Sequence, residues 1–554
     1  MTYPAAPAMD APPEKGLAYK WKVLISVIFG IFMIILDSTV INVALQTLRS
    51  EYGVTLNDVQ WVISIYALAL GITTPLSGFL ADRFGIKNVY VAGLAVFTLA
   101  SVLCGIAPVF WMLIAARMLQ GIGGGMAQPL GPAMLYRAFP PKEQGTALGF
   151  FGIALVVAPA LGPILGGLLV DADMWRYIFF INLPIGILGF FLASRFLKRD
   201  ERTGKAKADP LGIITSIVAF GSLLYAATQA AEQGWTSPTT IIFFAIGGIG
   251  LLAFIIIELF VVKEPLLELR LFKNPAFTVA TLLGYVTVLA LFGAEFLMPI
   301  YLQALRGRSA LETGLLLLPL AVTSGIATPV AGKLYDKIGP RVLVVVGFSL
   351  LVVNTWQLSQ IEALTPISTI MWLFALRGLA LGLVVQTTFT TALSAVPPRI
   401  LPRGSSLING TRFVVQSIGV AVLATILASG LSQQTKDFQA QAQEQASAAG
   451  TSSGAAKFGI CETPGVDPAN NLPAAAANLP VPAQAQVKTK ITQACGEYLM
   501  GFDRAYTFTF YFAIVAVIIG LFLPGWPLKW AGRGSNQSTV GNPTADGPPP
   551  SVAH

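Results

Sequence analysis

Two acidic residues and one arginine interrupt stretches that are otherwise almost entirely apolar, and their types suit proton transfer. They are Asp37, Glu295 and Arg117. A charge inside a membrane costs roughly 2.5–3.5 kcal/mol, so it usually has a role or a partner. Burial favours the neutral form of a carboxyl group, which lets the group bind and release protons near neutral pH. We therefore interpret these three residues as candidates for proton coupling.

Each candidate also has a structural interpretation. Asp37 and Glu295 can hold hydrogen bonds at an outer helix end, and Arg117 can serve only to pair with helix ends and acids. The single histidine, His554, is the last residue, so carboxylates are the available proton carriers. Asp37 is the main candidate, because Glu295 comes late in its apolar stretch and nears the outer mouth.

The sequence lacks the patterns of other active sites. The three cysteines, Cys104, Cys461 and Cys495, are scattered and match no zinc or iron–sulfur spacing. No phosphate-cradling G-x-x-x-x-G-K-[ST] loop occurs, so nothing indicates an ATP-driven pump. No nucleophile–base or metal constellation is visible. We therefore expect no enzymatic activity, no metal and no cofactor.

The composition shows which kind of element must position the candidate residues. Of the 554 residues, 55% are hydrophobic and 11% are charged, and the mean hydropathy is +0.70. Soluble proteins carry about 25% charged residues, which excludes a cytosolic enzyme, a disordered scaffold and a nucleic-acid binder. A membrane-spanning helix needs about 20 mostly apolar residues. Fourteen stretches qualify, near 22–45, 57–81, 89–107, 109–135, 144–170, 177–196, 209–230, 239–261, 275–303, 313–333, 342–358, 367–396, 404–430 and 505–526.

Positive charge predicts the orientation of these spans, because loops that face the cytoplasm hold an excess of Lys and Arg. With the N-terminus inside, 23 of the 35 Lys and Arg residues fall in inner segments and nine in outer segments. An even number of spans returns the C-terminus to the same side. We predict a multi-pass protein of the cytoplasmic cell membrane with both termini in the cytoplasm.

The chain contains an internal repeat. Residues 73–87 align without gaps with residues 327–341, at a constant offset of 254 residues, and Arg117 recurs as Arg377 at an offset of 260. Parallel repeats of this kind are typical of transporters. They predict an all-α integral membrane protein with two pseudo-symmetric six-helix bundles and two extra helices. The predicted divisions are a cytoplasmic tail (1–21), an N-terminal bundle (22–196), a linker with two additional helices (197–274), a C-terminal bundle (275–526) and a cytoplasmic tail (527–554).

The repeated segment suggests a gate. Its glycines permit close helix approach and a tight turn, and its charges can hold two bundles together in one state and release them in another. The alternative is that positive charge there only controls topology. The residues concerned are Gly78, Asp82, Arg83, Gly85 and Lys87, with Gly332, Asp336 and Gly339 in the second copy.

The segment 158–167 combines small residues with prolines. Gly162 and Gly166, with Gly167 beside them, form a face on which helix backbones can touch. Pro159 and Pro163 remove backbone donors and bend the helix. Ordinary helix packing is the alternative interpretation.

Taken together, the motifs resemble the major facilitator superfamily, and more narrowly its fourteen-helix drug:proton antiporter subfamily. The resemblance covers nearly the whole chain and adds that the 158–167 helix seals against leak. It implies a multidrug efflux transporter, a proton-coupled antiporter that exports hydrophobic, cationic or neutral drugs or toxic compounds. The motifs, in chain order, are LDSTVINVAL (36–45), GFLADRFGIK (78–87), RMLQGIGGG (117–125), APALGPILGG (158–167), WRYIFFINLPIG (175–186) and GLLLLPLA (314–321).

Two other functions fit parts of the sequence. The same mechanism can export an endogenous lipid, siderophore or metabolite. A non-transporting receptor or scaffold would not need transport motifs in both halves. The expected partners are a hydrophobic small molecule, protons and the lipid bilayer, with no nucleic acid. Candidate cavity residues, which packing or interface anchoring also explains, are Asn42, Trp61, Tyr66, Phe292, Phe296 and Tyr301.

The polar segment 431–503 is longer than the compact loop expected at that point of the family. In the predicted orientation it faces the exterior, where Cys461 and Cys495 form either a disulfide or two free thiols. The segment is also a candidate site for a periplasmic adaptor protein.

A labelling experiment tests the predicted orientation. A membrane-impermeant thiol reagent added from outside should react with Cys461 and should not react with a cysteine that replaces Lys205. Labelling of the cysteine at position 205 but not of Cys461 would show that the protein has the opposite orientation in the membrane.

Overall fold

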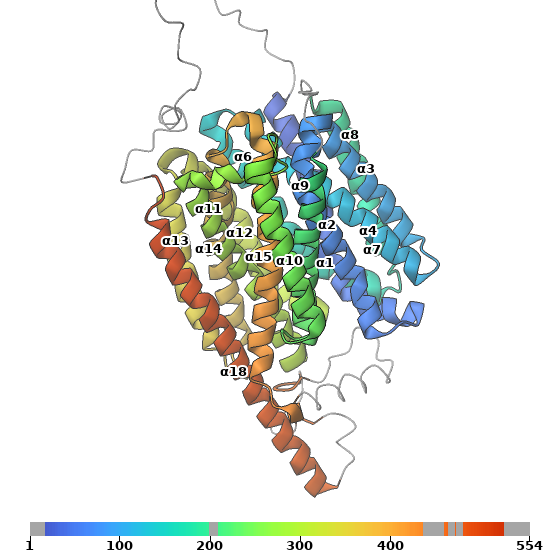
Figure 1. The fold of residues 1–554 in the computed structure, drawn as a ribbon. Helices are drawn as coiled ribbons and strands as arrows, with labels where there is room; N and C mark the ends of the chain where they lie inside the picture. The colour runs from blue at the N-terminus through green and yellow to red at the C-terminus, as the bar shows by residue number, and fades with distance from the viewer. Residues whose placement is uncertain (1–16, 199–208, 436–458, 464–470, 473–479, 526–554) are drawn as a thin grey trace, which may run out of the picture.

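The computed structural model describes residues 17–198, 209–435, 459–463, 471–472 and 480–525, and every regular element within them is a helix (Figure 1). Residues 1–16 of the predicted N-terminal tail, the predicted C-terminal tail and most of the segment 197–208, including Lys205, lie outside these residues, and α1 begins at Tyr19, inside the predicted N-terminal tail. The first half contains α1 (Tyr19–Tyr52), α2 (Leu56–Phe84), α3 (Ile86–Gly105), α4 (Phe110–Ala127), α5 (Leu130–Ala138), α6 (Gln144–Asp171), α7 (Tyr177–Phe180) and α8 (Asn182–Phe196). A helical pair follows, formed by α9 (Pro210–Gln233) and α10 (Pro238–Ile256), then the short turns η2 (Ile257–Val261) and η3 (Leu269–Lys273).

The second half repeats the order of the first. It contains α11 (Pro275–Ile300), the π-helical turn η4 (Tyr301–Leu305), α12 (Ala310–Ile338), α13 (Pro340–Ser359), α14 (Ile367–Ser394), α15 (Leu401–Ser429) and α18 (Val481–Gly520). Short 3₁₀ turns, Pro141–Glu143 and Pro398–Ile400, precede α6 and α15.

Thirteen helices of the described residues are long and apolar enough to cross a membrane. The one predicted span that is missing from these thirteen is 109–135. It corresponds to α4 and the start of α5. Arg117, Gln120 and four glycines lower its apolar content. Because α4 packs between α2 and α3, its polar side chains are enclosed by protein.

The internal repeat extends to the helix ends. Thr55 and Asp58 form a capping box at the start of α2, and Ser309 and Glu312 form one at the start of α12, again 254 residues apart. Each box satisfies backbone N–H groups that a helix end leaves unpaired. Both helices end at glycines in the left-handed region, at Gly85 (φ 88°) and Gly339 (φ 79°). The same local signals therefore start and stop the same helix in each half.

The two halves meet along two seams. One seam lies between α2 and α15, and the other lies between α6 and α12. One hydrophobic core, containing Phe97 and Phe151 of the first half with Phe348 and Phe389 of the second, spans both halves. This shared core reaches the end of the bundle that carries Asp82 and Asp336, here called the Asp82 end. At the opposite end each half has a separate core.

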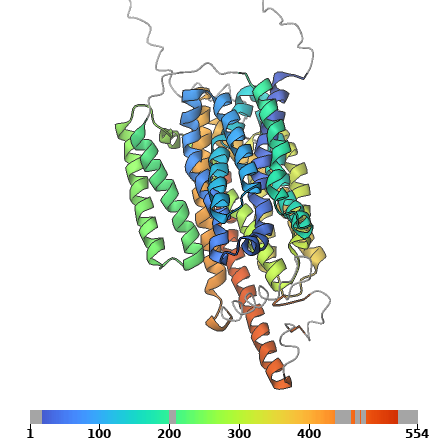
Figure 2. The same cartoon turned by 90° about the vertical axis from the view of Figure 1, so that its right-hand side faces the viewer.

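The extra pair lies outside the two halves (Figure 2). α9 packs against α2 and α15, so it covers one of the two seams, and α10 packs on α9. Trp235, two residues after α9, donates to Thr425 Oγ1 at 2.6 Å. The pair is thus bound to both halves at the place where they meet.

The final helix is longer than predicted. The span was placed at 505–526, but α18 has 40 residues and begins at Val481 (Figure 1). At about 1.5 Å per residue it exceeds the roughly 30 Å of a bilayer core. The segment 481–503 is therefore helical, and only part of 431–503 is loop. Ala494, Tyr498 and Phe502 of this segment are buried in the core of the second half, and the start of the helix extends beyond the bundle (Figure 1). No proline follows Pro482 within the helix to interrupt it.

A disulfide joins Cys461 to Cys495, which decides between the two states left open by the sequence. The irregular segment 459–463 lies along the end of η4, where the backbone N–H groups of Ile460 and Cys461 donate to Ala304 O and Leu305 O at 3.0 and 2.8 Å. Glu462 forms an ion pair with Arg306. The labelling test therefore needs reduction of this disulfide before Cys461 can react. The proposed adaptor site remains a prediction, since residues 436–458, 464–470 and 473–479 lie outside the described residues.

Alanine substitutions at two glycines should have opposite effects, because Gly332 lies at the seam between α6 and α12 and Gly284 lies on α11 with open space around it. A Cβ atom on Gly332 would lie 2.3 Å from Gly145 O, whereas a Cβ atom on Gly284 would meet nothing within 4 Å. We expect Gly332→Ala to lose about 1–3 kcal/mol through overpacking. Gly284→Ala should gain up to about 1 kcal/mol of helix propensity. Thermal unfolding of the purified protein checks the ordering, and equal midpoints would contradict it.

Candidate functional site

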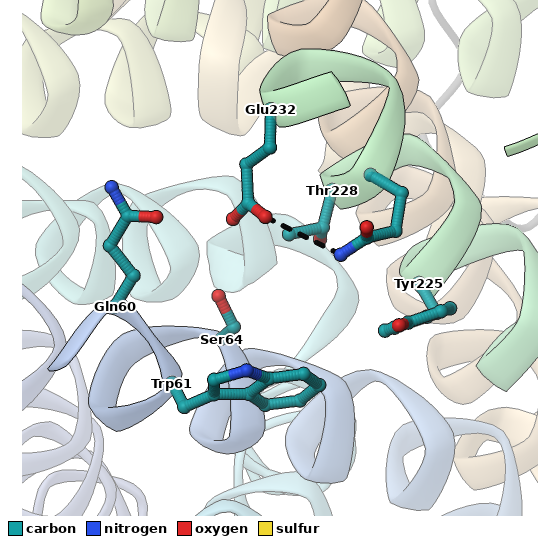
Figure 3. A pocket seen from close by; sticks show the side chains of 7 residues that line it. Gln60, Trp61, Ser64, Tyr225, Thr228 and Glu232 are labelled. Atoms are coloured by element: carbon teal, nitrogen blue, oxygen red, sulfur yellow. Dashed lines mark hydrogen bonds between the residues drawn. The ribbon is translucent and has the colours of Figure 1, made fainter. Parts of the chain in front are cut away.

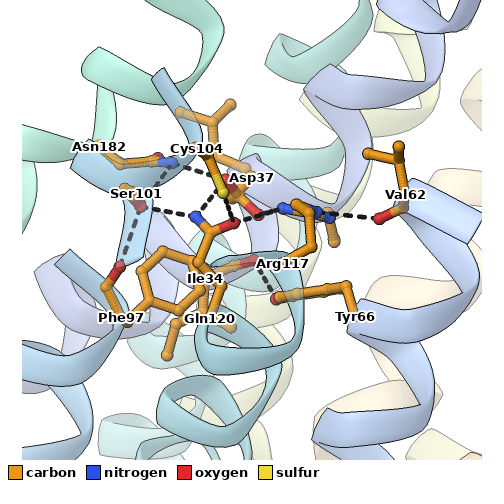
Figure 4. A network of polar contacts seen from close by, with 12 residues as sticks. Ile34, Asp37, Val62, Tyr66, Phe97, Ser101, Cys104, Arg117, Gln120 and Asn182 are labelled. Atoms are coloured by element: carbon orange, nitrogen blue, oxygen red, sulfur yellow. Dashed lines mark hydrogen bonds and ion pairs between the residues drawn. The ribbon is translucent and has the colours of Figure 1, made fainter. Parts of the chain in front are cut away.

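Asp37 lies in the middle of α1 and is 1% exposed (Figure 4). Its Oδ2 is 2.6 Å from Arg117 Nη1 in an ion pair. Its Oδ1 accepts hydrogen bonds from Asn182 Nδ2 at 2.6 Å and from Gln120 Nε2 at 3.1 Å. Three donors from α4 and α8 thus satisfy a carboxylate that has no contact with solvent.

Arg117 links three helices of the first half. Besides the ion pair with Asp37 on α1, its Nε donates to Val62 O on α2 at 2.9 Å. Its guanidinium lies over the ring of Tyr66, also on α2, 4.3 Å from the ring centroid. Tyr66 donates to Ile34 O of α1 at 3.2 Å. Nη2 of Arg117 is buried without a hydrogen-bond partner among the described residues.

Neutral polar side chains complete the network. Gln120 accepts from Arg117 Nη1 at 2.8 Å and donates to Ser101 Oγ at 2.6 Å. The thiol of Cys104 donates to Gln120 Oε1 at 3.2 Å. Gln120 and Asn182 stand within quoted motifs, but neither was predicted as a site residue. An amide in the middle of an apolar span is the signal that identifies them, since a buried polar group needs a partner.

The electrostatics of this arrangement depend on the ion pair between Asp37 and Arg117. A buried ion pair is tolerated when additional hydrogen bonds satisfy the remaining polar atoms, and removing one partner leaves an uncompensated buried charge. Protonation of Asp37 removes the negative charge and leaves Arg117 held only by neutral groups of α2 and α4. The ion pair is therefore an electrostatic link between α1 and α4 that depends on the charge of Asp37.

The proline- and glycine-rich segment of α6 packs directly beside this site. A Cβ atom on Gly162 would lie 2.2 Å from Thr39 Oγ1, and one on Gly166 would lie 2.7 Å from Val40 O. Thr39 and Val40 follow Asp37 within one turn of α1. The two prolines, Pro159 and Pro163, lie inside α6, and a Cβ on Gly167 would be 3.6 Å from Leu311 Cβ of α12. α6 thus connects the surroundings of Asp37 to the second half.

The second half has a related arginine. Arg377 of α14 is fully buried and donates to Asn354 Oδ1 at 3.0 Å, to Thr355 Oγ1 at 3.3 Å and to Ala290 O. Position 295 lies on α11, but the side chains of Glu295 and Phe292 are outside the described part of the chain. The role of Glu295 therefore stays a prediction.

The two copies of the repeated motif bridge the two halves at the Asp82 end. Asp82 pairs with Arg403 Nε of α15 at 2.5 Å. Asp336 accepts from the backbone N–H groups of Gly145 and Thr146 at 2.8 Å each and from Thr146 Oγ1 at 2.6 Å. Asp336 thereby caps the start of α6 from the other half of the molecule. A Cβ atom on Gly78 would lie 2.8 Å from Arg403 Cα.

The predicted charge cluster of Asp82, Arg83 and Lys87 is instead divided among separate partners. Lys87 donates to Ser194 O and Leu197 O at 2.7 and 2.6 Å, so it binds the end of α8. Arg83 is exposed and lies 5.6 Å from the ring centroid of Phe84. The physical reason is direction: Asp82 and Arg83 are neighbours on α2 and point to different sides, and Lys87 stands on α3 after the turn at Gly85.

The candidate cavity residues fall into different environments. Trp61 stacks on Tyr225 of α9, with ring centroids 6.0 Å apart, and lines a small pocket between α2 and α9 (Figure 3). Tyr301 is buried and donates to Glu362 O at 2.7 Å, which is a packing role. Asn42 is exposed, and Phe296 is partly buried against the core of the second half. The pocket is also lined by Gln60, Ser64, Thr228, Gln229 and Glu232.

Comparison with known proteins identifies the family. The family model described as Major Facilitator Superfamily matches residues 27–420. The chain belongs to the major facilitator superfamily. This major facilitator transporter is 37% identical over 418 residues to the "Uncharacterized MFS-type transporter YhcA" of Bacillus subtilis, covering 76% of this chain and 78% of that protein.

A second relative of this transporter is named for drug resistance. The "Multidrug resistance protein B homolog" of Mycobacterium tuberculosis is 32% identical over 394 residues, covering 71% of this chain and 73% of that protein. The structure of the human organic anion transporter MFSD10 (TETRAN) superposes with a TM-score of 0.55 at 14% identity, covering 92% of this chain and 100% of that one. That likeness shows the shared major facilitator fold.

Charge balance at Asp37 predicts the stability of site variants of this transporter. Asp37→Asn leaves Arg117 buried without a counter-charge, which should cost about 3–5 kcal/mol. The double variant Asp37→Asn/Arg117→Gln removes both charges and should recover most of the loss. Thermal unfolding in detergent measures both.

The matched control is an exposed ion pair. Glu51 and Arg176 lie 3.2 Å apart, with side chains 41% and 43% exposed. Glu51→Gln should cost less than about 1 kcal/mol. A double variant at Asp37 and Arg117 that is less stable than Asp37→Asn would show that the pair is not charge-coupled.

Proposed function

We propose that this transporter is a proton-coupled antiporter of the cytoplasmic membrane that exports hydrophobic, cationic or neutral drugs or toxic compounds. The observation that supports this proposal most strongly is the burial of Asp37 and its ion pair with Arg117. Its carboxylate is buried in the centre of a transport bundle, and its ion pair with Arg117 joins α1 to α4. A carboxylate of this kind can exchange a counter-charge for a proton.

The coupling step follows from the contacts of Asp37. In the ionised state, Arg117 holds α1 against α4, while Val62 and Tyr66 keep the guanidinium on α2. Protonation removes the ion pair but leaves the contacts to α2. α1 is then held to α2 and α4 by neutral hydrogen bonds alone and can move more easily, and α6 transmits this movement to α12 through the contacts at Gly162 and Gly167. Proton binding thereby favours one orientation of the halves over the other.

The chemistry of the substrate is inferred from charge and from relatives. No lysine is buried within the described residues, and three of the four buried arginines there are paired with acids: Arg117 with Asp37, Arg306 with Glu462 and Arg403 with Asp82. The fourth, Arg377, is held by neutral groups of the protein. This distribution favours cationic or neutral compounds over anionic ones. The name of the mycobacterial relative, "Multidrug resistance protein B homolog", supports drug-like compounds.

The orientation is part of the proposal. The excess of Lys and Arg places both termini and the Asp82 end in the cytoplasm. The halves share a core at that end and have separate cores at the other. In this orientation, the pairs made by Asp82 and Asp336 close the cytoplasmic side.

Transport in proteoliposomes under an imposed pH gradient tests the proposal. Asp37→Asn should abolish proton-driven transport while retaining part of substrate binding, because the amide fixes a neutral state. Asp37→Glu keeps a titratable group and should retain transport with a shifted pH profile, which keeps the test informative if Asp37→Asn folds poorly. Glu51→Gln serves as the control and should transport like the wild type.

Two outcomes would contradict the proposal. Wild-type rates and an unchanged pH profile in Asp37→Asn would remove Asp37 from coupling and make Glu295 the next candidate. Absence of drug transport by the wild type, together with a cargo-specific growth defect on deletion, would instead support export of an endogenous lipid, siderophore or metabolite.

A further inference from the structure

A second pair of buried carboxyl groups lies on the extra helices, away from Asp37. Asp209 precedes α9 and is 4% exposed, and Glu258 lies in η2 after α10 and is 1% exposed. The site of a Cβ atom on Gly212 would be 2.0 Å from Asp209 Oδ2 and 2.6 Å from Glu258 Oε1. The two carboxyl oxygens therefore face the same point and are neighbours.

The facing oxygens have no hydrogen-bond partner, although each carboxyl group is anchored by its other oxygen. Asp209 Oδ1 accepts from Gly212 N at 2.8 Å and so caps α9. Glu258 Oε2 accepts from Leu267 N at 3.4 Å. Asp209 Oδ2 and Glu258 Oε1 remain buried and unpartnered among the described residues. Two ionised carboxylates this close together and this deeply buried would repel each other.

We propose that Asp209 and Glu258 form a second proton-binding site, which holds one proton between the two carboxyl groups in the conformation seen here. A shared proton turns one oxygen into a donor for the other, so both unpartnered atoms are satisfied at once. This site lies on other helices than Asp37 does, and its hydrogen-bond donors are backbone groups of Gly212 and Leu267.

The surroundings connect this site to the gate. Glu258 accepts a hydrogen bond from the backbone N–H of Leu267. In the same segment, the carbonyl oxygen of Pro265 accepts a hydrogen bond from Arg403 Nη1 at 2.8 Å. The same arginine pairs with Asp82 through Nε. Residues 265–267 are buried between the carboxyl pair and Arg403. Movement of Glu258 therefore moves the segment that positions Arg403.

The charged groups around the site determine the direction of the effect. Asp209 and Arg403 act electrostatically on Glu258, and Arg137, Arg399 and Arg403 act on Asp82. Lys263, Glu264 and Arg270, on the segment between η2 and α11, are exposed. Loss of the shared proton adds one negative charge that competes with Asp82 for Arg403. Deprotonation thus weakens the Asp82–Arg403 pair and favours opening of the Asp82 end.

Distance measurements between spin labels test this directly, without substrate or gradient. Asn88→Cys and Lys333→Cys place labels on exposed positions of the two halves near the Asp82 end. Cys104 is buried, and the other two cysteines are disulfide-bonded, so the labels go to the introduced sites. In nanodiscs, the wild-type distance distribution should shift to longer distances as pH is raised.

Glu258→Gln mimics the protonated group and should abolish this shift at every pH. Asp209→Asn keeps the capping oxygen and should do the same, which provides a second variant if the first folds poorly. Glu264→Gln, an exposed residue of the neighbouring segment, is the matched control and should shift as the wild type does. Because no transport is measured, failure of the proposed export function would leave this result intact.

Three outcomes would overturn the proposal. One is a wild type whose distances do not change with pH. Another is a Glu258→Gln variant that shifts with the wild-type midpoint, which would assign the pH response to other groups such as Asp37. The third is a shift that follows sodium at constant pH when sodium replaces an organic cation, which would make the site a metal-ion site.

Discussion

A carboxylate enclosed by apolar helices must be given either a counter-charge or a proton, and the position of Asp37 makes this choice central to the transporter. The counter-charge is Arg117, which reaches α1 from α4 while its other groups bind α2. Amides from α4 and α8 hold the second oxygen. Asp37 and Arg117 thus tie together four first-half helices, α1, α2, α4 and α8, and in the proposed mechanism a proton on Asp37 changes these contacts. Breaking such a pair is costly, which gives the proton a large effect on conformation.

The two halves share local signals but use equivalent residues differently. The capping boxes and terminal glycines recur at the same offset, since both copies must start and stop the same helix. Asp82 and Asp336 each reach across a seam, but Asp82 binds a side chain and Asp336 caps a backbone end. Only the first of these contacts is adjacent to α9, α10 and the segment after them. The extra helices thus have access to one gate contact and not to its counterpart.

Much of this fold could be predicted from the sequence, because apolar stretches indicate membrane spans and the residue spacing reveals the internal repeat. Asp37 and Arg117 were predicted because charged residues are conspicuous in apolar spans. Their pairing with Gln120 and Asn182 was not, since it requires the packing of α1, α4 and α8, and amides carry no charge to mark them. Asp209 and Glu258 could not be predicted as a site, because they stand near the ends of their spans, where charged residues are common. Tyr66 and Tyr301 were predicted as cavity residues, but both are buried in packing contacts, and an aromatic residue in a span fits either role.

In the proposed mechanism, proton coupling depends on Asp37 exchanging its ion pair for a proton. Infrared difference spectroscopy of the purified protein, between neutral and acidic pH, reports this exchange through the carbonyl stretch of a protonated carboxyl group. The account predicts a band in the wild type that is missing from the spectrum of Asp37→Asn and is reversed when a transported drug is added. Identical spectra for the two proteins would mean that Asp37 keeps its charge throughout, and would contradict the claim.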